Sequence, residues 1–487
     1  PRYWEDCMKS ALGSCFLCAW TLFVALGAEA AVAAERLNIL FCIADDWSYP
    51  HASIYGDAVV RTPTFDRIAR EGTLFTNCYC AAPSCTPSRA AILTGRFPHS
   101  LEEGANLWGF LPARYVVYPD LLEQAGYHVG HTGKGWAPGN FQAGGRARNP
   151  AGPAYKSFAQ FLDACPRGKP FCFWFGSTHP HRPYKPGSGR QAGLSAALVT
   201  VPPFWPDRPE VRHDLLDYYA AVQQFDQQLA ELVAELEKRQ LYEHTLIVVT
   251  SDNGMPFPRA KANLYDCGTR MPLAIRWPKV TRPGSRIEQF VSHTDLAPTF
   301  LEAAGVPPPA QLHGRSLKPL LQGNAKSWPD AAFTERERHA YVREGNLSYP
   351  ARAIRTERYL YIRNFRPDRW PAGDPQLVFA VGPFGDIDDG PTKRLILTGQ
   401  NEPQLRRYFE LACAKRPAEE LYDLKNDPHQ MHNVADKPEY AEVKRELAQR
   451  LHAWMKATGD PRAVMDDDRF DKVPYFGNPA KKEKPAP

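Results

Sequence analysis

The chain has 487 residues, too many for one small core, and this length favours a large α/β domain with an appendage. Hydrophobic residues make up 43% and charged residues 23%, as in ordinary globular proteins. The formal net charge is only +5, and no long run of lysine and arginine precedes the final residues. The charge therefore argues against a nucleic-acid partner, while a mildly basic protein still tolerates anionic substrates.

The first residues have charged, apolar and small residues in the order that is typical of an export signal. Met8 and Lys9 precede an apolar run over residues 15–26, and small residues follow over residues 28–34. This order predicts a signal peptide over residues 1–34 that starts at Met8, so that the mature chain is exported. A membrane tether or a lipid anchor is the alternative. No later stretch is long and apolar enough to cross a bilayer, and we expect no membrane span in the mature chain.

Two apolar segments of strand length end in acidic and amide residues. Residues 37–44 form a continuous apolar run, which is typical of a buried strand in a mostly parallel sheet, and residues 244–250 predict another buried strand. Four polar side chains follow these two runs: Asp45, Asp46, Asp252 and Asn253. Because parallel strands bring their carboxyl ends to one edge, these side chains predict an all-oxygen site for Ca²⁺ or Mg²⁺. A pair of solvated turns is the alternative.

Cys85 lies at the start of a predicted helix. Pro87 suits the first turn, residues 88–94 continue the helix, and Gly95 suits its C-terminal stop. The helix start favours negative charge at Cys85, and Arg89, one turn further on, can reach back to it. A cysteine in this place is a candidate nucleophile. The alternative is a core cysteine that happens to lie beside a helix start.

Two further predicted strands end in loops with titratable side chains. The strand over residues 127–132 is followed by Lys134, and the strand over residues 169–176 is followed by His179 and His181. Sites in open α/β sheets form beyond such strand ends. The alternative is that both histidines are ordinary loop residues.

Past about residue 330 the chain changes to shorter strands and turns. We therefore expect a catalytic domain over residues 36–330 and a C-terminal subdomain over residues 331–470. Residues 348–355 and 357–363 predict an antiparallel hairpin within the subdomain. The lysine- and proline-rich tail, residues 471–487, is expected to be disordered.

One charged segment of this subdomain is a candidate binding region. Residues 334–339 are rich in groups that can hydrogen-bond a sugar or pair with an anion. We expect Arg338 and His339 to bind substrate there. The alternative is a solvated charged turn.

The motifs in their joint order resemble a known family. Cys-x-Pro-Ser-Arg at residues 85–89, followed by Leu-Thr-Gly at residues 93–95, resembles the signature of the formylglycine-dependent type I sulfatases. Residues 252–265 carry Asp-Asn-Gly-x-Pro-Phe-Pro and then Lys261 before Asn-Leu-Tyr, which is most similar to heparan N-sulfatase (sulfamidase)-like members. The resemblance implies an alkaline-phosphatase-like α/β fold. That fold has a large, mostly parallel central sheet flanked by helices and a smaller C-terminal α+β subdomain with an antiparallel sheet.

The resemblance also implies roles for single residues. Cys85 would be converted to formylglycine by a formylglycine-generating or equivalent maturation enzyme, and the hydrated aldehyde would be the nucleophile. This side chain would complete a Ca²⁺ site, or alternatively a Mg²⁺ site, with the four strand-end residues. Arg89 would stabilise the deprotonated nucleophile. Lys134 and Lys261 would hold sulfate oxygens, and His181 would donate a proton to the leaving atom.

One position departs from the family pattern. Trp136 stands where the family usually has a histidine, two residues after the lysine. That histidine commonly helps to regenerate the aldehyde, so the base for this step is left open. His131 is near in sequence, but on a strand we expect it to be structural.

The function implied by the resemblance is removal of N-sulfate or O-sulfate groups from a sulfated saccharide through a covalent sulfo-enzyme, most closely as in heparan N-sulfatase. One alternative is an O-sulfatase that acts on another sulfated polysaccharide. Others are a phosphohydrolase of the same fold and a glycan-binding pseudoenzyme in which Cys85 stays a thiol. Export would place the protein in the periplasm or medium of a bacterium, or in the lysosome or secretions of a eukaryote.

Overall fold

The structure is a computed structural model that describes residues 36–325, 327–376, 382–465 and 468–477. The predicted signal peptide therefore lies outside the described residues. The described residues from Asn38 onward form one compact unit, which contains both sheets. In the part of the chain that the structure describes, no helix has the length and apolar character needed to cross a membrane. All eight cysteines of that part are free thiols.

The larger sheet has eight strands in the order β3–β4–β1–β5–β6–β2–β7, with β8 paired to β2. Its strands are β1 (Asn38–Ala44), β2 (Thr73–Tyr79), β3 (His128–Gly133), β4 (Phe171–Gly176), β5 (Thr245–Ser251), β6 (Arg270–Arg276), β7 (Ser285–Ile287) and β8 (Val291–Ser292). The run β3–β4–β1–β5 is parallel, whereas β6 is antiparallel to both β5 and β2. The predicted mostly parallel central sheet is confirmed.

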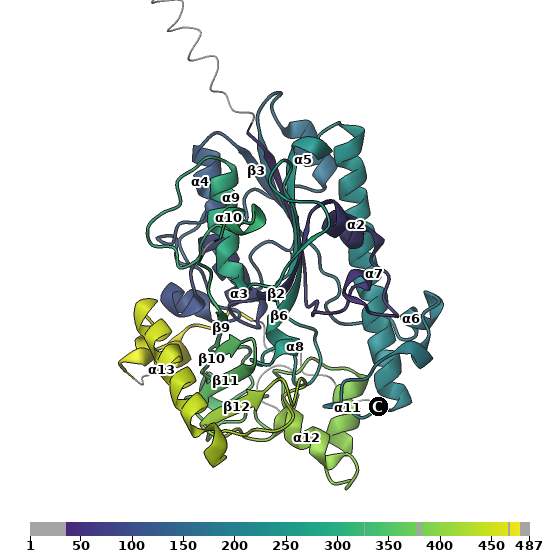
Figure 1. Ribbon diagram of the computed structural model, residues 1–487, viewed down its shortest axis with the longest axis vertical. Coiled ribbons are helices and arrows are strands. Elements are labelled where there is room, and N and C mark those ends of the chain that lie inside the picture. Colours follow the sequence, from purple (N-terminus) through teal and green to yellow (C-terminus); the bar gives the residue numbers. More distant parts are fainter. Residues whose placement is uncertain (1–35, 326, 377–381, 466–467, 478–487) are drawn as a thin grey trace, which may run out of the picture. The chain divides into compact units, whose positions relative to one another are not determined.

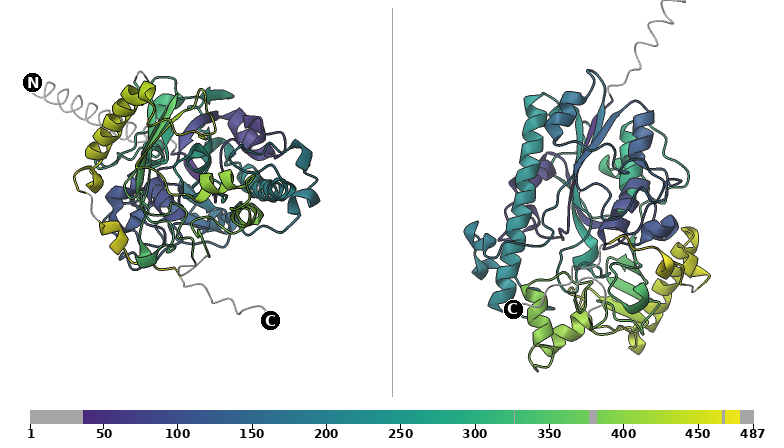
Figure 2. Two further views of the ribbon diagram at one scale, coloured as in Figure 1. Left: turned by 90° about the horizontal axis from the view of Figure 1, so that it is seen from below. Right: turned by 180° about the vertical axis from the view of Figure 1, so that it is seen from behind.

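Helices cover both faces of this sheet (Figure 1). One face carries α2 and α7 and the other carries α3, α4 and α9, an arrangement that the view from behind repeats (Figure 2). The longer helices are α2 (Pro63–Glu71), α3 (Cys85–Thr94), α4 (Tyr118–Gln124), α5 (Phe158–Ala164), α7 (Pro209–Lys238) and α9 (Leu296–Ala303). The short helices are α6 (Ser188–Gln191), α8 (Asp266–Thr269) and α10 (Lys318–Leu321).

The side chains of β1 show why the central strands are apolar throughout. Successive side chains of a strand point to opposite faces of the sheet. Leu40 and Cys42 join the core that contains the buried faces of α2 and α7. Phe41 points the other way, and its ring lies 5.4 Å from that of Phe300 on α9. Because both faces pack against helices, all seven residues of β1 are buried.

The second sheet has four antiparallel strands in the order β12–β11–β10–β9. They are β9 (Ala331–Arg336), β10 (Ala351–Thr356), β11 (Tyr359–Asn364) and β12 (Glu419–Asp423). The remaining longer helices are α11 (Pro391–Thr398), α12 (Arg406–Cys413) and α13 (Ala441–Ala457). Helix α13 packs on β10 and β11 and buries Leu447 and Leu451 against the sheet, while α11 contacts α7. The predicted hairpin and antiparallel sheet are confirmed.

Residues 471–477 correct one expectation, because they are ordered rather than a disordered tail. The backbone N–H of Ser348 donates to Asp471 Oδ1 at 2.7 Å, and the N–H of Phe476 donates to the carbonyl of Trp108 at 2.8 Å. These bonds to distant parts of the chain offset the entropy lost on ordering the segment. The composition of the tail did not indicate them.

Candidate active site

The carboxyl ends of four parallel strands bring most of the predicted site residues to one edge of the larger sheet. These residues are Asp45 and Asp46 after β1, Lys134 after β3, His181 beyond β4, and Asp252 and Asn253 after β5. The parallel pairing of these strands explains why the site residues lie close together, because neighbouring parallel strands end at the same edge of a sheet.

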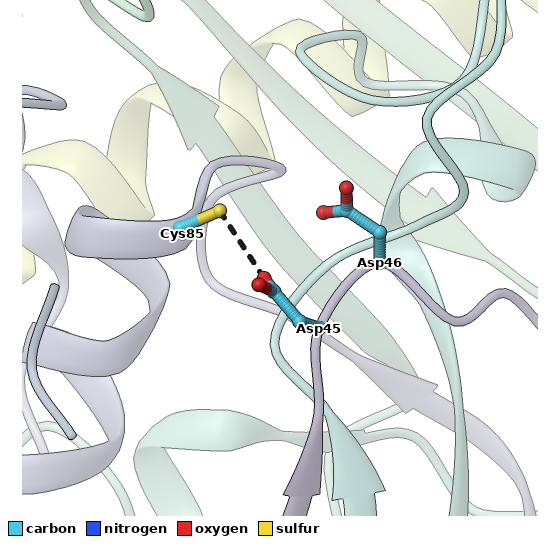
Figure 3. Close-up of side chains that lie close together, drawn as sticks. All are labelled: Asp45, Asp46 and Cys85. Atoms are coloured by element: carbon cyan, nitrogen blue, oxygen red, sulfur yellow. Dashed lines mark hydrogen bonds between the residues drawn. The ribbon is translucent and has the colours of Figure 1, made fainter. Parts of the chain in front are cut away.

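Cys85 faces this edge from the first turn of α3 (Figure 3). The helix begins at Cys85 itself rather than just after it, and ends as predicted at Gly95, which has a φ of 66° and donates its N–H to the carbonyl of Ala91. Cys85 Sγ lies 3.6 Å from Asp45 Oδ1, and the side chain is 2% exposed. Burial raises the pKa of the thiol well above its usual value, so the unmodified thiol is a poor nucleophile.

The oxygen atoms around Cys85 fit a hard divalent cation. Ligand atoms of Asp45, Asp46 and Cys85 all lie within 4.8 Å of one another. Asn253 Nδ2 donates to Asp46 Oδ1 at 2.7 Å, whereas Asn253 Oδ1 is buried and finds no hydrogen-bond partner in the described part of the chain. A buried amide oxygen is costly unless it gains a partner. Carboxylate and amide oxygens together are the ligands that Ca²⁺ and Mg²⁺ prefer.

Two lysines pair with the two carboxylates of the first strand end. Lys134 Nζ donates to both oxygens of Asp45 at 2.7 Å, and Lys261 Nζ donates to Asp46 Oδ2 at 2.8 Å. Burial would raise the pKa of Asp45, but Lys134 and its cationic neighbours hold it well below the usual range. Burial raises the pKa of Asp46 to about 6, and Lys261 offsets this only in part. Asp46 therefore has most to gain from further positive charge.

Arg89 is completely buried and connects three parts of the site. Its Nε donates to Asp252 Oδ2 at 2.8 Å, and its Nη1 donates to the carbonyls of Lys134 and Gly135 at 2.7 and 3.0 Å. Its Nη2 is buried, has no hydrogen-bond partner within the ranges that the structure describes, and lies 3.8 Å from Asp45 Oδ1. The guanidinium therefore holds the second strand end and the lysine loop against α3.

A cavity of about 560 Å³ opens beside Cys85, and Lys134, Lys261 and His181 are among the residues that line it. The Nδ1 of His181 is hydrogen-bonded to the carbonyl of Arg182, so this nitrogen carries a proton. Its Nε2 lies 3.8 Å from Asp46 Oδ2, and the side chain is 35% exposed. The Nε2 atom is therefore the ring nitrogen that is free to exchange a proton with a ligand.

Several residues that line the cavity were missed in the sequence, among them Trp108, Tyr475 and Asp388. Asp388 Oδ2 lies 3.3 Å from Lys261 Nζ, so Lys261 is shared between Asp46 and Asp388. Burial would raise the pKa of Asp388, but the positive charge of Lys261 holds it well below the usual range. Its only signal in the sequence was a short acidic run over residues 386–389.

The structure separates the two residues expected to bind substrate. His339 lines the cavity, and its Nδ1 shares a 2.8 Å hydrogen bond with Ser84 Oγ. Arg338 is buried, and its guanidinium donates to the carbonyls of Val473 and Pro474 at 2.7 and 3.1 Å. The expectation for Arg338 is therefore corrected, because these donors hold the carboxyl-terminal segment beside the cavity instead of facing a ligand.

Trp136 is 1% exposed, and its backbone N–H donates to Asn149 Oδ1 at 3.0 Å. His131 Nδ1 is hydrogen-bonded to the carbonyl of Gly152 at 2.9 Å, which agrees with a structural role. Among the histidines that follow strand ends, His179 and His181 line the cavity.

Two family models match the chain. Residues 37–149 and 150–306 match the model described as Sulfatase, which is more than half of the chain. Residues 259–376 match the model described as N-sulphoglucosamine sulphohydrolase, C-terminal.

Known proteins resemble the chain over most of its length. An ulvan-active sulfatase of Formosa agariphila is 31% identical over 450 residues, which are 88% of this chain and 81% of that protein. The N-sulphoglucosamine sulphohydrolase of Homo sapiens is 29% identical over 89% of this chain and 93% of its own. A solved structure of a protein in complex with its substrate D-glucosamine-2-N,6-O-disulfate matches with a TM-score of 0.65 and 24% identity, over 89% of this chain and all of that one. This last likeness supports the alkaline-phosphatase-like fold.

Proposed function

Because the chain belongs to the sulfatase family, and is thus a sulfate-ester or sulfamate hydrolase, we propose that its substrate is a saccharide with an N-sulfated glucosamine unit. The observation that carries the proposal is the meeting of Cys85, an oxygen-ligand set and two lysines beside one cavity. The sulfur atom of Cys85 marks where formylglycine, on which the family's reaction generally depends, would present its oxygen.

The comparisons favour an amino sugar over other sulfated units. Residues 259–376 match a C-terminal region described for N-sulphoglucosamine sulphohydrolase, and the human relative of that name matches along most of the chain. The structural relative is described with a sulfated glucosamine as its substrate. The ulvan-active relative supports a second candidate, an O-sulfatase that acts on another sulfated polysaccharide.

The residues of the site have distinct tasks in this proposal. When bound, a divalent cation would be held by side-chain oxygens of the four residues at the strand ends, Asp45, Asp46, Asp252 and Asn253. Its positive charge would stabilise an anionic oxygen next to Cys85. Lys134 and Lys261 both line the cavity, and their ammonium groups can transfer hydrogen bonds from the carboxylates to sulfate oxygens. Arg89 holds the carboxylate of Asp252 and keeps α3 in place. His181 can donate a proton from Nε2 to the leaving nitrogen or oxygen.

We also propose that the mature protein is exported. Residues 1–34 have the charged, apolar and small-residue order of a signal peptide. A formylglycine-generating or equivalent enzyme would then be its maturation partner.

Release of inorganic sulfate from defined saccharides tests the proposal. We expect turnover of N-sulfoglucosamine, no turnover by Cys85→Ala or Cys85→Ser, and a wild-type peptide that has lost the sulfur of Cys85 in mass spectrometry. The proposal is wrong if the alanine variant keeps its activity, or if phosphate esters are hydrolysed in preference to sulfates. A purified protein with modified Cys85 that releases only O-sulfate would select the second candidate.

A further inference from the structure

We infer that the cavity contains a sugar-recognition subsite that selects an uncharged or amino sugar and rejects a uronic acid. Asp388 would accept hydrogen bonds from hydroxyl or amino groups of the ring, and Trp108 with Tyr475 would receive its apolar face. The inference rests on the proposed function and specifies which class of sugar the cavity accepts.

Asp388 places a negative charge in a cavity that must admit an anion. Its side chain is 29% exposed and lines the cavity, with Oδ2 3.3 Å from Lys261 Nζ. Lys261 also pairs with Asp46 at 2.8 Å, so the cation that pairs with Asp388 among the described residues is shared. Its charge is therefore incompletely neutralised, which disfavours a second anionic group on the substrate and favours O–H and N–H donors.

His339, which lies near Asp388 in the cavity wall, does not neutralise the negative charge of Asp388. Burial lowers the pKa of His339 to about 4, so its ring is neutral near pH 7. The ring is held by Ser84 Oγ at 2.8 Å. His339 therefore adds hydrogen-bonding capacity to the wall but no positive charge that would attract a carboxylate.

An aromatic wall is formed by two segments that are distant in the sequence. The ring centroids of Trp108 and Tyr475 are 6.2 Å apart, and both residues line the cavity. The N–H of Phe476 donates to the carbonyl of Trp108 at 2.8 Å, which joins the two segments directly. Arg338 lies over the Tyr475 ring at 5.3 Å while its donors hold the two preceding carbonyls.

This combination suits a sugar ring. A pyranose has an apolar face, which packs on aromatic rings, and an edge of hydroxyl and amino groups, which need acceptors. The volume of about 560 Å³ lies in the ordinary range for small-molecule sites, so it suits the end of a saccharide rather than a long stretch of polymer. A ring held between Asp388 and the aromatic wall would present its sulfate to the lysines beside Cys85.

Binding to the Cys85→Ala protein tests the subsite without any dependence on turnover. Titration calorimetry would compare N-sulfoglucosamine with an O-sulfated hexuronic acid. We expect the amino sugar to bind at least about 10-fold more tightly, and Asp388→Asn in the same background to reduce this ratio to below about 3-fold. Asp389→Asn is the matched control, because Asp389 is 67% exposed and pairs with Arg394, and it should leave the ratio unchanged.

The aromatic wall is tested in the same background. Tyr475→Ala should weaken binding of the amino sugar roughly 10-fold and leave binding of inorganic sulfate unchanged, whereas Tyr475→Phe should retain most of the affinity. An unchanged ratio in Asp388→Asn, or unchanged affinity in Tyr475→Ala, would overturn the subsite. Turnover of the saccharide panel by wild-type protein tests the proposed function separately, so a lack of turnover with retained discrimination would refute only that function.

Discussion

Two buried groups of acidic and related side chains in the described residues have similar composition but different surroundings. Asp45, Asp46 and Cys85 form one group, and a second contains His99, Glu335 and Asp460; in each, the ligand atoms lie within 4.8 Å of one another. By composition alone, either could be taken for a metal site. The second group also borders a cavity, of about 590 Å³, to which His99 contributes.

The polar atoms of the second group form hydrogen bonds and ion pairs with neighbouring residues of the protein, so we call this group saturated. Arg352 Nε donates to Asp460 Oδ2 at 2.6 Å, and its Nη2 donates to Glu337 Oε1 at 2.8 Å. Both the ring and the backbone N–H of His99 are hydrogen-bonded to Glu335. The bonds to Glu335 tie the 3₁₀ segment Pro98–Ala105 to β9, and a 3.2 Å hydrogen bond between His99 Nε2 and the carbonyl of Thr458 ties it to the end of α13.

Unpaired atoms lie beside the first group, since Asn253 Oδ1 and Arg89 Nη2 are both buried and have no hydrogen-bond partner among the described residues. Its lysines line a cavity, where a ligand can compete for them. The comparison teaches that ligand composition does not distinguish a site from a structural network. What distinguishes a site is the presence of buried polar groups without hydrogen-bond partners next to a cavity.

The largest effect should come from removing a charge in the unsaturated group. Asp46→Asn should lower kcat/KM for N-sulfoglucosamine by roughly 10²–10³-fold or more, because one oxygen of the proposed ion site becomes an amide nitrogen. Glu337→Gln in the saturated group should leave kcat/KM within a few-fold. Steady-state kinetics on both variants would contradict the comparison if they lost activity to the same extent.

The saturated group should matter instead for stability. Arg352→Met should lower the free energy of unfolding by about 3–5 kcal/mol, because it leaves buried carboxylates without their cation. Urea denaturation followed by circular dichroism measures this change. The control is Arg406→Leu, which removes an exposed pair with Glu410 and should have a much smaller effect. Equal losses in the two variants would show that the Arg352 network is not structural.

Removal of divalent cations should affect only the first group. If the proposed ion binds with free ion at about 100 times its Kd, chelation should cost about 2.7 kcal/mol, seen as a Tm lower by a few degrees. Asp46→Asn should abolish this response, and Asp460→Asn should retain it. If the response to the chelator disappears in Asp460→Asn but persists in Asp46→Asn, the ion binds at the second group and the prediction is contradicted.

A buried histidine outside both groups should give a smaller, pH-dependent effect. His293 contacts the hydroxyls of Ser88 and Thr250, and burial lowers its pKa to about 3. The unfolded chain therefore takes up a proton below about pH 6.5 that the folded protein does not, so stability falls as the pH falls. Between pH 7 and pH 5 this costs about 2 kcal/mol. In urea denaturation at both pH values, His293→Gln should reduce the loss by that amount, and an unchanged loss would contradict the assignment.

The residues predicted from the sequence were those next to strong local patterns. Asp45 and Asp252 directly follow continuous apolar strands, and parallel pairing then fixes where they meet. The start of α3 likewise followed from the proline, the helical run and the glycine stop around Cys85. Such signals lie within a few residues of the side chain concerned.

The sugar-facing residues have no such signal. Tyr475 and Trp108 meet only because the carboxyl-terminal segment packs across the cavity, and Asp388 comes from a loop without periodicity. The same packing turned Arg338 from an expected substrate contact into an anchor for backbone carbonyls. Tertiary contacts between distant segments cannot be read from propensity or spacing, which describe only local structure.

The burial of Cys85 imposes an order of events during synthesis. An enzyme that modifies this side chain must reach it before α3 packs against the sheet, since only 2% of the side chain is exposed afterwards. Asp252, Asp388 and Tyr475 are all synthesised after Cys85. At about 5–20 residues per second, the roughly 400 residues from Cys85 to Tyr475 take tens of seconds to make. Because Asp252, Asp388 and Tyr475 are translated only after Cys85, the nascent chain would give the proposed maturation enzyme time to reach this side chain before its surroundings are complete.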